Sequence, residues 1–123
     1  MKTRLVGVSP LPLLEQAREL FSSGYLVAAA VTARSACEAF VFTLCEQVGY
    51  HGNSKRAWRT HGRIDGLRKL GLLDDLSRHH CYVALEIGGD AAHGRVPGAE
   101  RVEKSLDGLE SVFAVAAKPA AQD

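Results

Sequence analysis

The segment from Tyr25 to Val48 constrains the fold of this chain more than any other. Apolar side chains recur along it at helical spacing, and Gly49 follows where a helix commonly ends. Such a helix is about 35 Å long, so we expect it to be the central helix of the domain. Its alanine-rich first half predicts that a neighbouring helix approaches closely. The periodic positions are Leu26, Ala29, Ala30, Ala33, Cys37, Phe40, Val41, Leu44 and Val48.

Apolar periodicity predicts shorter helices in the rest of the chain. One begins at Ser9-Pro10 and ends at 22–24, one covers Arg63 to Leu70, one begins after a cap at Asp74 or Asp75, and the last covers Glu100 to Ala117. Residues 50–61 are expected to form a loop. The side chains expected to face inward are Leu13, Leu14, Ala17, Leu20 and Phe21, then Ile64, Leu67 and Leu70, then Leu76, His80, Val83, Ala84 and Ile87, and finally Val102, Leu106, Leu109, Val112, Phe113 and Ala116. No stretch alternates at period two, so we predict an all-α, up-and-down bundle of four to five helices. It forms one domain over residues 1–123, with its core over about 13–117.

Composition limits the classes of function. The chain has 123 residues and a net charge of +1, so any contact with nucleic acid must come from a local patch. The three cysteines lack the spacing of a disulfide framework or a zinc site, and we interpret them as small buried side chains in a reducing compartment. No cofactor or metal is predicted. The chain shows neither a membrane-spanning run nor a signal-peptide core, so a cytoplasmic location is expected.

The stretch Gly88-Gly89-Asp90-Ala91-Ala92-His93-Gly94 is the most informative for function. Each glycine inside a helix costs about 1 kcal/mol of stability, and we expect the apolar helix to stop at Gly88 and Gly89. His93 then lies at a helix break near the surface, where its imidazole can act as acid or base near pH 7. The alternative is a polar residue that only satisfies loop carbonyls.

Arg34 and Glu38 lie one helical turn apart on the central helix, among apolar neighbours. Charges on such a helix are costly to bury unless they are paired, and the order Arg-then-Glu is the weaker orientation for helix stability. One interpretation is a polar notch facing the His93 segment. The other is a partly exposed ion pair that contributes little.

A basic segment follows the central helix. Cations alternate with aromatic side chains there, which suits a phosphate backbone with stacked bases; the alternative is a solvated loop with Trp58 packed on the bundle. The residues are Tyr50, His51, Lys55, Arg56, Trp58, Arg59, His61 and Arg63. Adjacent His79 and His80 point about 100° apart on a helix and so cannot share a metal; we expect His80 in the core and His79 outside.

Taken together, these residues resemble the HEPN superfamily, and especially its bacterial domain-of-unknown-function branch. The likeness rests on Arg34-x-x-x-Glu38, on a passage from Arg63 to Leu73, and on Gly88-x-x-Ala91-Ala92-His93-Gly94, over roughly residues 13–115. The resemblance implies a helical bundle that pairs into a homodimer. It also implies either a metal-independent ribonuclease of toxin and antiphage systems or a module that binds RNA, nucleotides or proteins.

The chain departs from the family pattern at two positions. Glu86 stands where the family has arginine, and Gly89 where it usually has asparagine. A carboxylate beside a phosphate is repulsive, so the usual active site is degenerate here, and Arg34 or Arg95 is left as the replacement cation. An Arg-x-x-x-x-His string from Arg56 to His61 lies in another element, and we interpret it as chance.

The resulting hypothesis is a homodimeric, RNA-associated or partner-binding module of a bacterial defence or toxin–antitoxin type system. The alternatives are an active metal-independent endoribonuclease and a structural adaptor of a larger effector complex. For an active enzyme the sequence predicts His93 as acid and base, Arg34 as the phosphate-neutralising cation and Glu38 as the group that orients one of them. The residues predicted to bind RNA are Lys55, Arg56, Trp58, Arg59 and Arg95.

Overall fold

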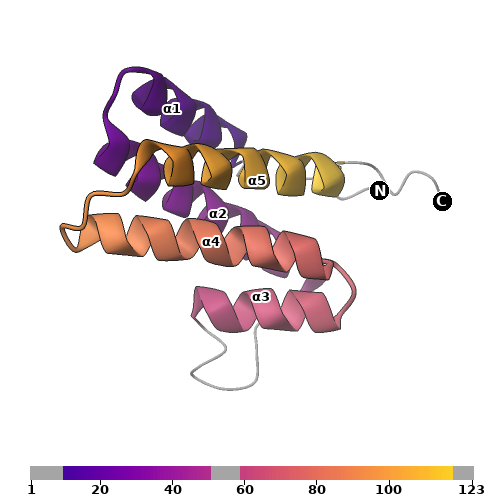
Figure 1. Ribbon diagram of the computed structural model, residues 1–123. Coiled ribbons are helices and arrows are strands. Elements are labelled where there is room, and N and C mark those ends of the chain that lie inside the picture. Colours follow the sequence, from indigo (N-terminus) through magenta and orange to yellow (C-terminus); the bar gives the residue numbers. More distant parts are fainter. Residues whose placement is uncertain (1–9, 51–58, 118–123) are drawn as a thin grey trace.

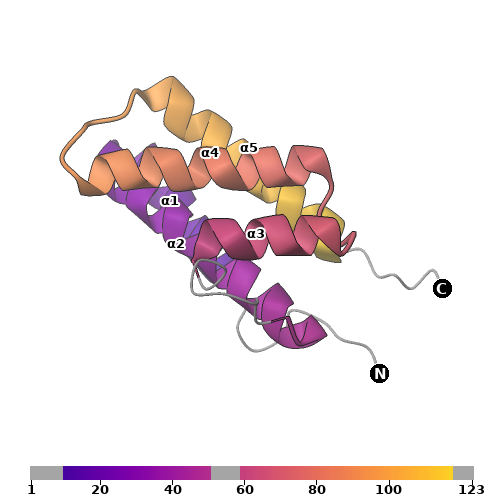
Figure 2. The same cartoon turned by 90° about the horizontal axis from the view of Figure 1, so that it is seen from below.

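A computed structural model describes residues 10–50 and 59–117 of the protein. This part of the chain forms five α-helices and no strand, which confirms the predicted all-α bundle (Figure 1). The helices are α1 (Leu11–Ser22), α2 (Leu26–Val48), α3 (Thr60–Lys69), α4 (Asp75–Ala92) and α5 (Ala99–Ala117). α2 packs against all four others, as expected of the central helix, and α3 lies beside α4 at the edge of the bundle (Figure 2).

Local sequence signals set several helix ends. Pro10 and Pro12 flank the start of α1, where a missing N–H costs nothing. α2 ends at Gly49, whose φ of 70° is the left-handed conformation that glycine adopts readily. Of the two predicted caps of α4, Asp74 is the one used: its carboxylate accepts a hydrogen bond of 2.7 Å from the Ser77 N–H.

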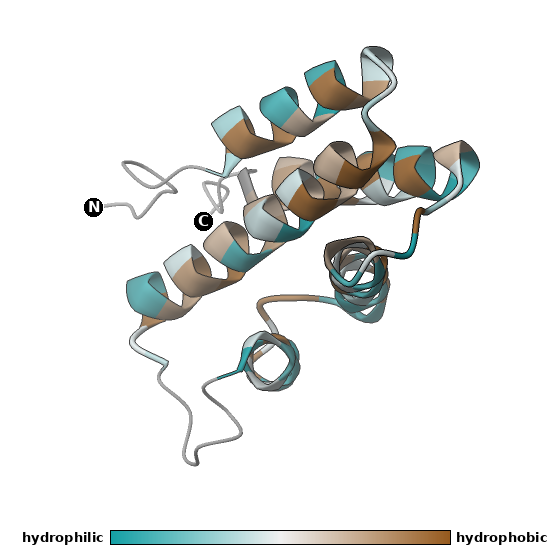
Figure 3. Cartoon of the chain, turned by 90° about the vertical axis from the view of Figure 1, so that its left-hand side faces the viewer, coloured by the Kyte–Doolittle hydropathy of each residue, from teal (hydrophilic) through white to brown (hydrophobic). Residues whose placement is uncertain are grey.

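The core lies where α2 meets α1, α4 and α5. The Phe40 and Phe113 rings pack with their centroids 4.8 Å apart and join α2 to α5. α4, seen end-on in Figure 3, turns its hydrophilic side away from α2. All three cysteines are buried and free, as predicted. The adjacent Cys81 thiol and burial raise the pKa of Cys37, which keeps it a neutral thiol in the core.

Several predictions about which side chains face inward were wrong. Leu70, the C-cap of α3, is exposed, and so is Leu76 in α4. α4 turns small residues toward the core in place of Leu76: Cys81, Ala84 and Ala91 are buried. α3 begins three residues earlier than expected, at Thr60. His79 is exposed as predicted, whereas His80 is only half-buried.

The prediction that α4 stops at its glycines was also wrong. The helix continues through Gly88 and Gly89 to Ala92, and His93 is its C-cap. A Cβ placed on Gly88 would lie 2.4 Å from Arg34 Cβ and 2.8 Å from the Ala30 carbonyl oxygen. Gly88 is therefore a close-contact residue between α4 and α2 and not a helix terminator, and the expected close approach to the alanine-rich half of α2 occurs at this point.

One helix in the described ranges, α2, is long and apolar enough to cross a membrane by length and composition alone. A core helix passes the same test, and the face of α2 that carries Ala33, Cys37 and Phe40 is buried inside the bundle.

Candidate functional site

An open polar cleft of about 710 Å³ lies between α2, the start of α3 and the end of α4. Three separate parts of the sequence contribute to its walls, because α3 and α4 lie side by side and both contact α2. The lining residues are Arg34, Glu38, Arg59, Thr60, His61, Leu85, Glu86, Gly89, Asp90, His93 and Arg95. The structure thus brings Arg34, Glu38 and His93 to one cleft; their chemical roles stay predictions.

Arg34 and Glu38 form a pair on the α2 wall. Arg34 Nε lies 3.3 Å from Glu38 Oε2, and the two side chains are 37% and 34% exposed. Nε is shielded from solvent but its N–H makes no aligned hydrogen bond, so the contact is Coulombic. Because both groups are partly in water, the pair itself adds little stability, and its effect is to keep the guanidinium at the cleft.

The glycines of α4 make room for Arg34. Its Cβ packs on Gly88, and its guanidinium passes close to Gly89, where an added Cβ would lie 3.8 Å from Nη1. A methyl group at Gly88 would occupy the path of the arginine, whereas one at Gly89 would make only ordinary van der Waals contact with it. Gly88 therefore lets a cation from the central helix reach the surface of the neighbouring helix.

His93 is held at the exposed C-terminal end of α4. Its Nδ1 lies 2.8 Å from the Gly89 carbonyl oxygen. A carbonyl only accepts hydrogen bonds, so the neutral imidazole carries its proton on Nδ1 and keeps the lone pair on Nε2. This contact is the one expected of a histidine that satisfies a carbonyl, and it also fixes the tautomer that a general base requires, so both interpretations fit the geometry.

The cleft contains three arginines and three carboxylates. Arg95 Nη1 lies 3.3 Å from Asp90 Oδ1, and Glu38 faces Arg34, so two of the carboxylates are engaged by cleft arginines. Glu86 is exposed on the α4 wall. Attraction for an anion depends on how the arginines are placed, because the formal charges of the lining residues balance.

Arg59 and His61 enter the cleft from the start of α3. Arg59 was predicted to contact RNA, but His61 was attributed to a chance motif because its element differs from that of His93. The packing of α3 beside α4 places both imidazoles on one cleft, whereas Arg56, the first residue of that motif, lies outside the described residues. No local sequence signal could have shown this, because it depends on how two helices pack.

A polar cluster fastens this part of α3 to α4. Asp65 Oδ1 accepts hydrogen bonds from the Tyr82 hydroxyl (2.7 Å) and Arg78 Nε (2.9 Å). The His61 ring packs against the edge of Tyr82, with centroids 4.8 Å apart. Burial alone would raise the pKa of Asp65, but the bonds from Tyr82 and Arg78 outweigh it and hold that pKa below its usual value.

The predicted basic segment lies only partly within the described residues. Arg63 does not belong to a basic surface: it is buried in α3, with its guanidinium 4.5 Å from the centre of the Phe42 ring. Lys55, Arg56 and Trp58 lie outside the described residues. Within 10–50 and 59–117, no three His, Cys, Asp or Glu side chains are grouped to hold a metal ion.

Comparison with known proteins finds no matching family model, no matching curated protein and no matching solved structure. By its fold and its site, the described part of the chain is an all-helical bundle with an open polar cleft along one edge.

Proposed function

We propose that this chain is a HEPN-like RNA-associated module whose cleft binds the phosphate backbone of RNA. The observation that carries the proposal is the convergence of Arg34, Arg59 and Arg95 on one cleft, from three separate parts of the chain. Guanidinium groups bind phosphate oxygens in pairs of hydrogen bonds. When cations from distant positions in the sequence meet at one place, a bound anion explains the arrangement better than a solvated helix face does.

Glu86 weakens this attraction without abolishing it. Two unit charges 4 Å apart interact by about 1 kcal/mol in water and about 4 kcal/mol near a protein surface. Because Glu86 is exposed, water and salt screen its repulsion of a phosphate. Glu38 and Asp90 are each paired with a cleft arginine, so the formal charges of the lining balance, and a phosphate would bind through the placement of the guanidinium N–H groups and not through net charge.

A second function, metal-independent endoribonuclease, is favoured by the tautomer of His93. In that reaction Nε2 takes the proton of the RNA 2′-hydroxyl, and the 2′ oxygen attacks phosphorus. The P–O5′ bond breaks, and the leaving oxygen takes a proton from an acid such as the His61 imidazolium. The products are a 2′,3′-cyclic phosphate and a 5′-hydroxyl. Arg34 would neutralise the phosphate, and Glu38 would orient Arg34.

The wider setting follows from the resemblance to HEPN proteins. We place the module in the cytoplasm, as a homodimer of a bacterial defence or toxin–antitoxin type system. A structural adaptor in a larger effector complex is the competing proposal, and it predicts a tight protein partner with no affinity for RNA.

Binding is tested by fluorescence anisotropy with a labelled single-stranded RNA of mixed sequence. We expect Arg59→Ala and Arg95→Ala each to weaken binding and to reduce the salt slope by about one ion. Arg101→Ala is the matched control, because Arg101 is an exposed arginine of α5 that does not line the cleft. Equal losses for all three variants, or no RNA affinity in the natural protein, would overturn the proposal.

Cleavage is tested by incubating the protein with the same RNA in EDTA and analysing the ends. The endoribonuclease predicts cyclic phosphate ends that disappear in His93→Ala and persist in His79→Ala, an exposed histidine of α4 outside the cleft. RNA binding without cleavage supports the non-catalytic module.

A further inference from the structure

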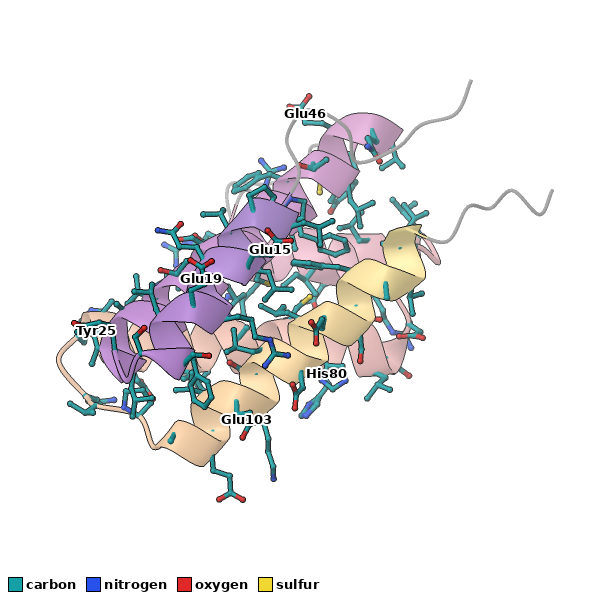
Figure 4. All side chains as sticks on the ribbon, turned by 90° about the horizontal axis from the view of Figure 1, so that it is seen from above. Glu15, Glu19, Tyr25, Glu46, His80 and Glu103 are labelled. Carbon is teal, nitrogen blue, oxygen red and sulfur yellow. The ribbon has the colours of Figure 1, made fainter. Side chains whose placement is uncertain are left out.

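A second hollow, of about 510 Å³, lies at the end of the bundle where α2 begins. Its lining is apolar and comes from residues 24–28 and Val96. Tyr25 and Val96 are strongly exposed, at 63% and 73%, and Val27 is also exposed. Figure 4 shows Tyr25 at this end, beside the loop between α4 and α5. Single exposed apolar residues are ordinary, but here an aromatic ring and two valines gather around one concavity.

The linings of the hollow and of the polar cleft include consecutive residues. Arg95 lines the cleft and Val96, the next residue, lines the hollow, so their Cα atoms are about 3.8 Å apart. Along α2, Val27 precedes Arg34 by seven residues, a rise of about 10 Å. A cationic surface and an apolar surface thus meet within the reach of one or two nucleotides.

We propose that the hollow holds a base of single-stranded RNA, stacked on Tyr25, while the adjoining phosphate contacts Arg95. This inference rests on the proposed function and adds a base-binding subsite to it. Exposed aromatic rings next to cations are the usual means of holding unpaired bases. The base must be unstacked to reach Tyr25, so the subsite selects single strands over duplexes.

The same hollow is less suited to a second copy of this chain. A stable protein interface buries about 800 Å² on each partner, and three exposed apolar side chains supply only a fraction of that. Arg95, which follows Asp90 in the cleft and precedes Val96 of the hollow, also suits a phosphate better than an apolar contact.

The test compares a single-stranded RNA with an abasic backbone of the same length. We expect Tyr25→Ala to weaken binding of the RNA by about 5- to 100-fold, the usual effect of removing one stacking ring, and to leave binding of the abasic backbone unchanged. Tyr25→Phe keeps the ring and retains the affinity. Leu76→Ala, which removes a side chain of similar exposure (62%) from the far end of α4, is the matched control.

The outcomes separate the two proposals. RNA binding that depends on Arg59 but not on Tyr25 overturns the base subsite and leaves the proposed function intact, whereas no binding of either ligand overturns the proposed function. If Tyr25→Ala lowers the sedimentation mass and leaves RNA affinity unchanged, the hollow is an interface between copies and the inference is wrong. Thermal melting verifies that each variant is folded.

Discussion

At the scale of single residues, Gly88 and Gly89 differ although they are adjacent in α4. Gly88 contacts Arg34 Cβ and the backbone of Ala30, whereas Gly89 has only the guanidinium of Arg34 nearby. One glycine sets the distance between two helices, and the other leaves room beside the cleft. Their substitution by alanine therefore has opposite effects on stability.

We expect Gly88→Ala to lower the free energy of unfolding by about 1–3 kcal/mol, because the added methyl overfills a backbone contact. Gly89→Ala is expected to raise it by up to about 1 kcal/mol, since alanine favours the helix and its Cβ meets only ordinary van der Waals contact. Urea denaturation of both variants measures the difference. Equal changes in the free energy of unfolding would show that Gly88 does not set the separation of α4 from α2.

The charge of Glu86 allows a test of where phosphate binds. Glu86→Gln removes the exposed negative charge from the cleft without changing the size of the side chain. If RNA phosphate binds there, affinity should rise by about fivefold in low salt, the equivalent of about 1 kcal/mol. Anisotropy titrations at two salt concentrations measure it, and unchanged affinity at both would place the phosphate away from Glu86.

At the scale of elements, the contact between α3 and α4 completes the cleft. It depends on Asp65, which accepts from Tyr82 and Arg78, and on an ion pair of Arg68 with Asp75. Both carboxyl groups have pKa values held below their usual range: Asp65 by the Tyr82 and Arg78 bonds against burial, Asp75 by the hydrogen bond from Arg68. The position of His61 and Arg59 follows from this contact.

The pH dependence of stability follows from these carboxyl groups. A carboxyl whose pKa is depressed on folding stabilises the protein above its unfolded value of 3.8, and that stability is lost as pH falls through the folded pKa. We expect the melting temperature to fall below about pH 4. Asp65→Asn should melt lower at pH 7 and show a smaller decrease on acidification. An identical pH profile in both proteins would contradict this account.

The helices could be predicted where the sequence determines them locally. The bounds of α2 and α5 follow from apolar periodicity and from Gly49, and Asp74 was one of two caps expected. The continuation of α4 through its glycines could not be predicted, because the reason lies in Arg34, on another helix. The exposure of Leu70 and Leu76 likewise depends on how α3 and α4 pack.

At the scale of the whole molecule, the cleft exists only after three helices have packed. A pocket that unites Arg34, Glu38 and His93 is one of the two interpretations that the sequence leaves open, and the structure brings these residues to one cleft. His61 belongs in the sequence to the separate basic segment, and only the packing of the helices brings it to the same cleft. The proposed base subsite was not foreseen either, because Tyr25 and Val96 become neighbours through the fold alone.

Self-association concerns the molecule as a whole. The proposed function includes a homodimer, and in that case light scattering at micromolar concentration should give twice the mass of 13.2 kDa. A monomer at high micromolar concentration would contradict it. Repeating the measurement with RNA separates association of the protein from association through the ligand.

Arg34 has its aliphatic stem between two packed helices and its charged end at the surface. An anion that anchors the guanidinium also restrains the stem, and hence the separation of α2 from α4. Amide hydrogens in the middle of these helices should therefore exchange with solvent more slowly when the cleft is filled. Slower exchange at backbone amides that the ligand does not touch would then show that the exposed cleft is occupied.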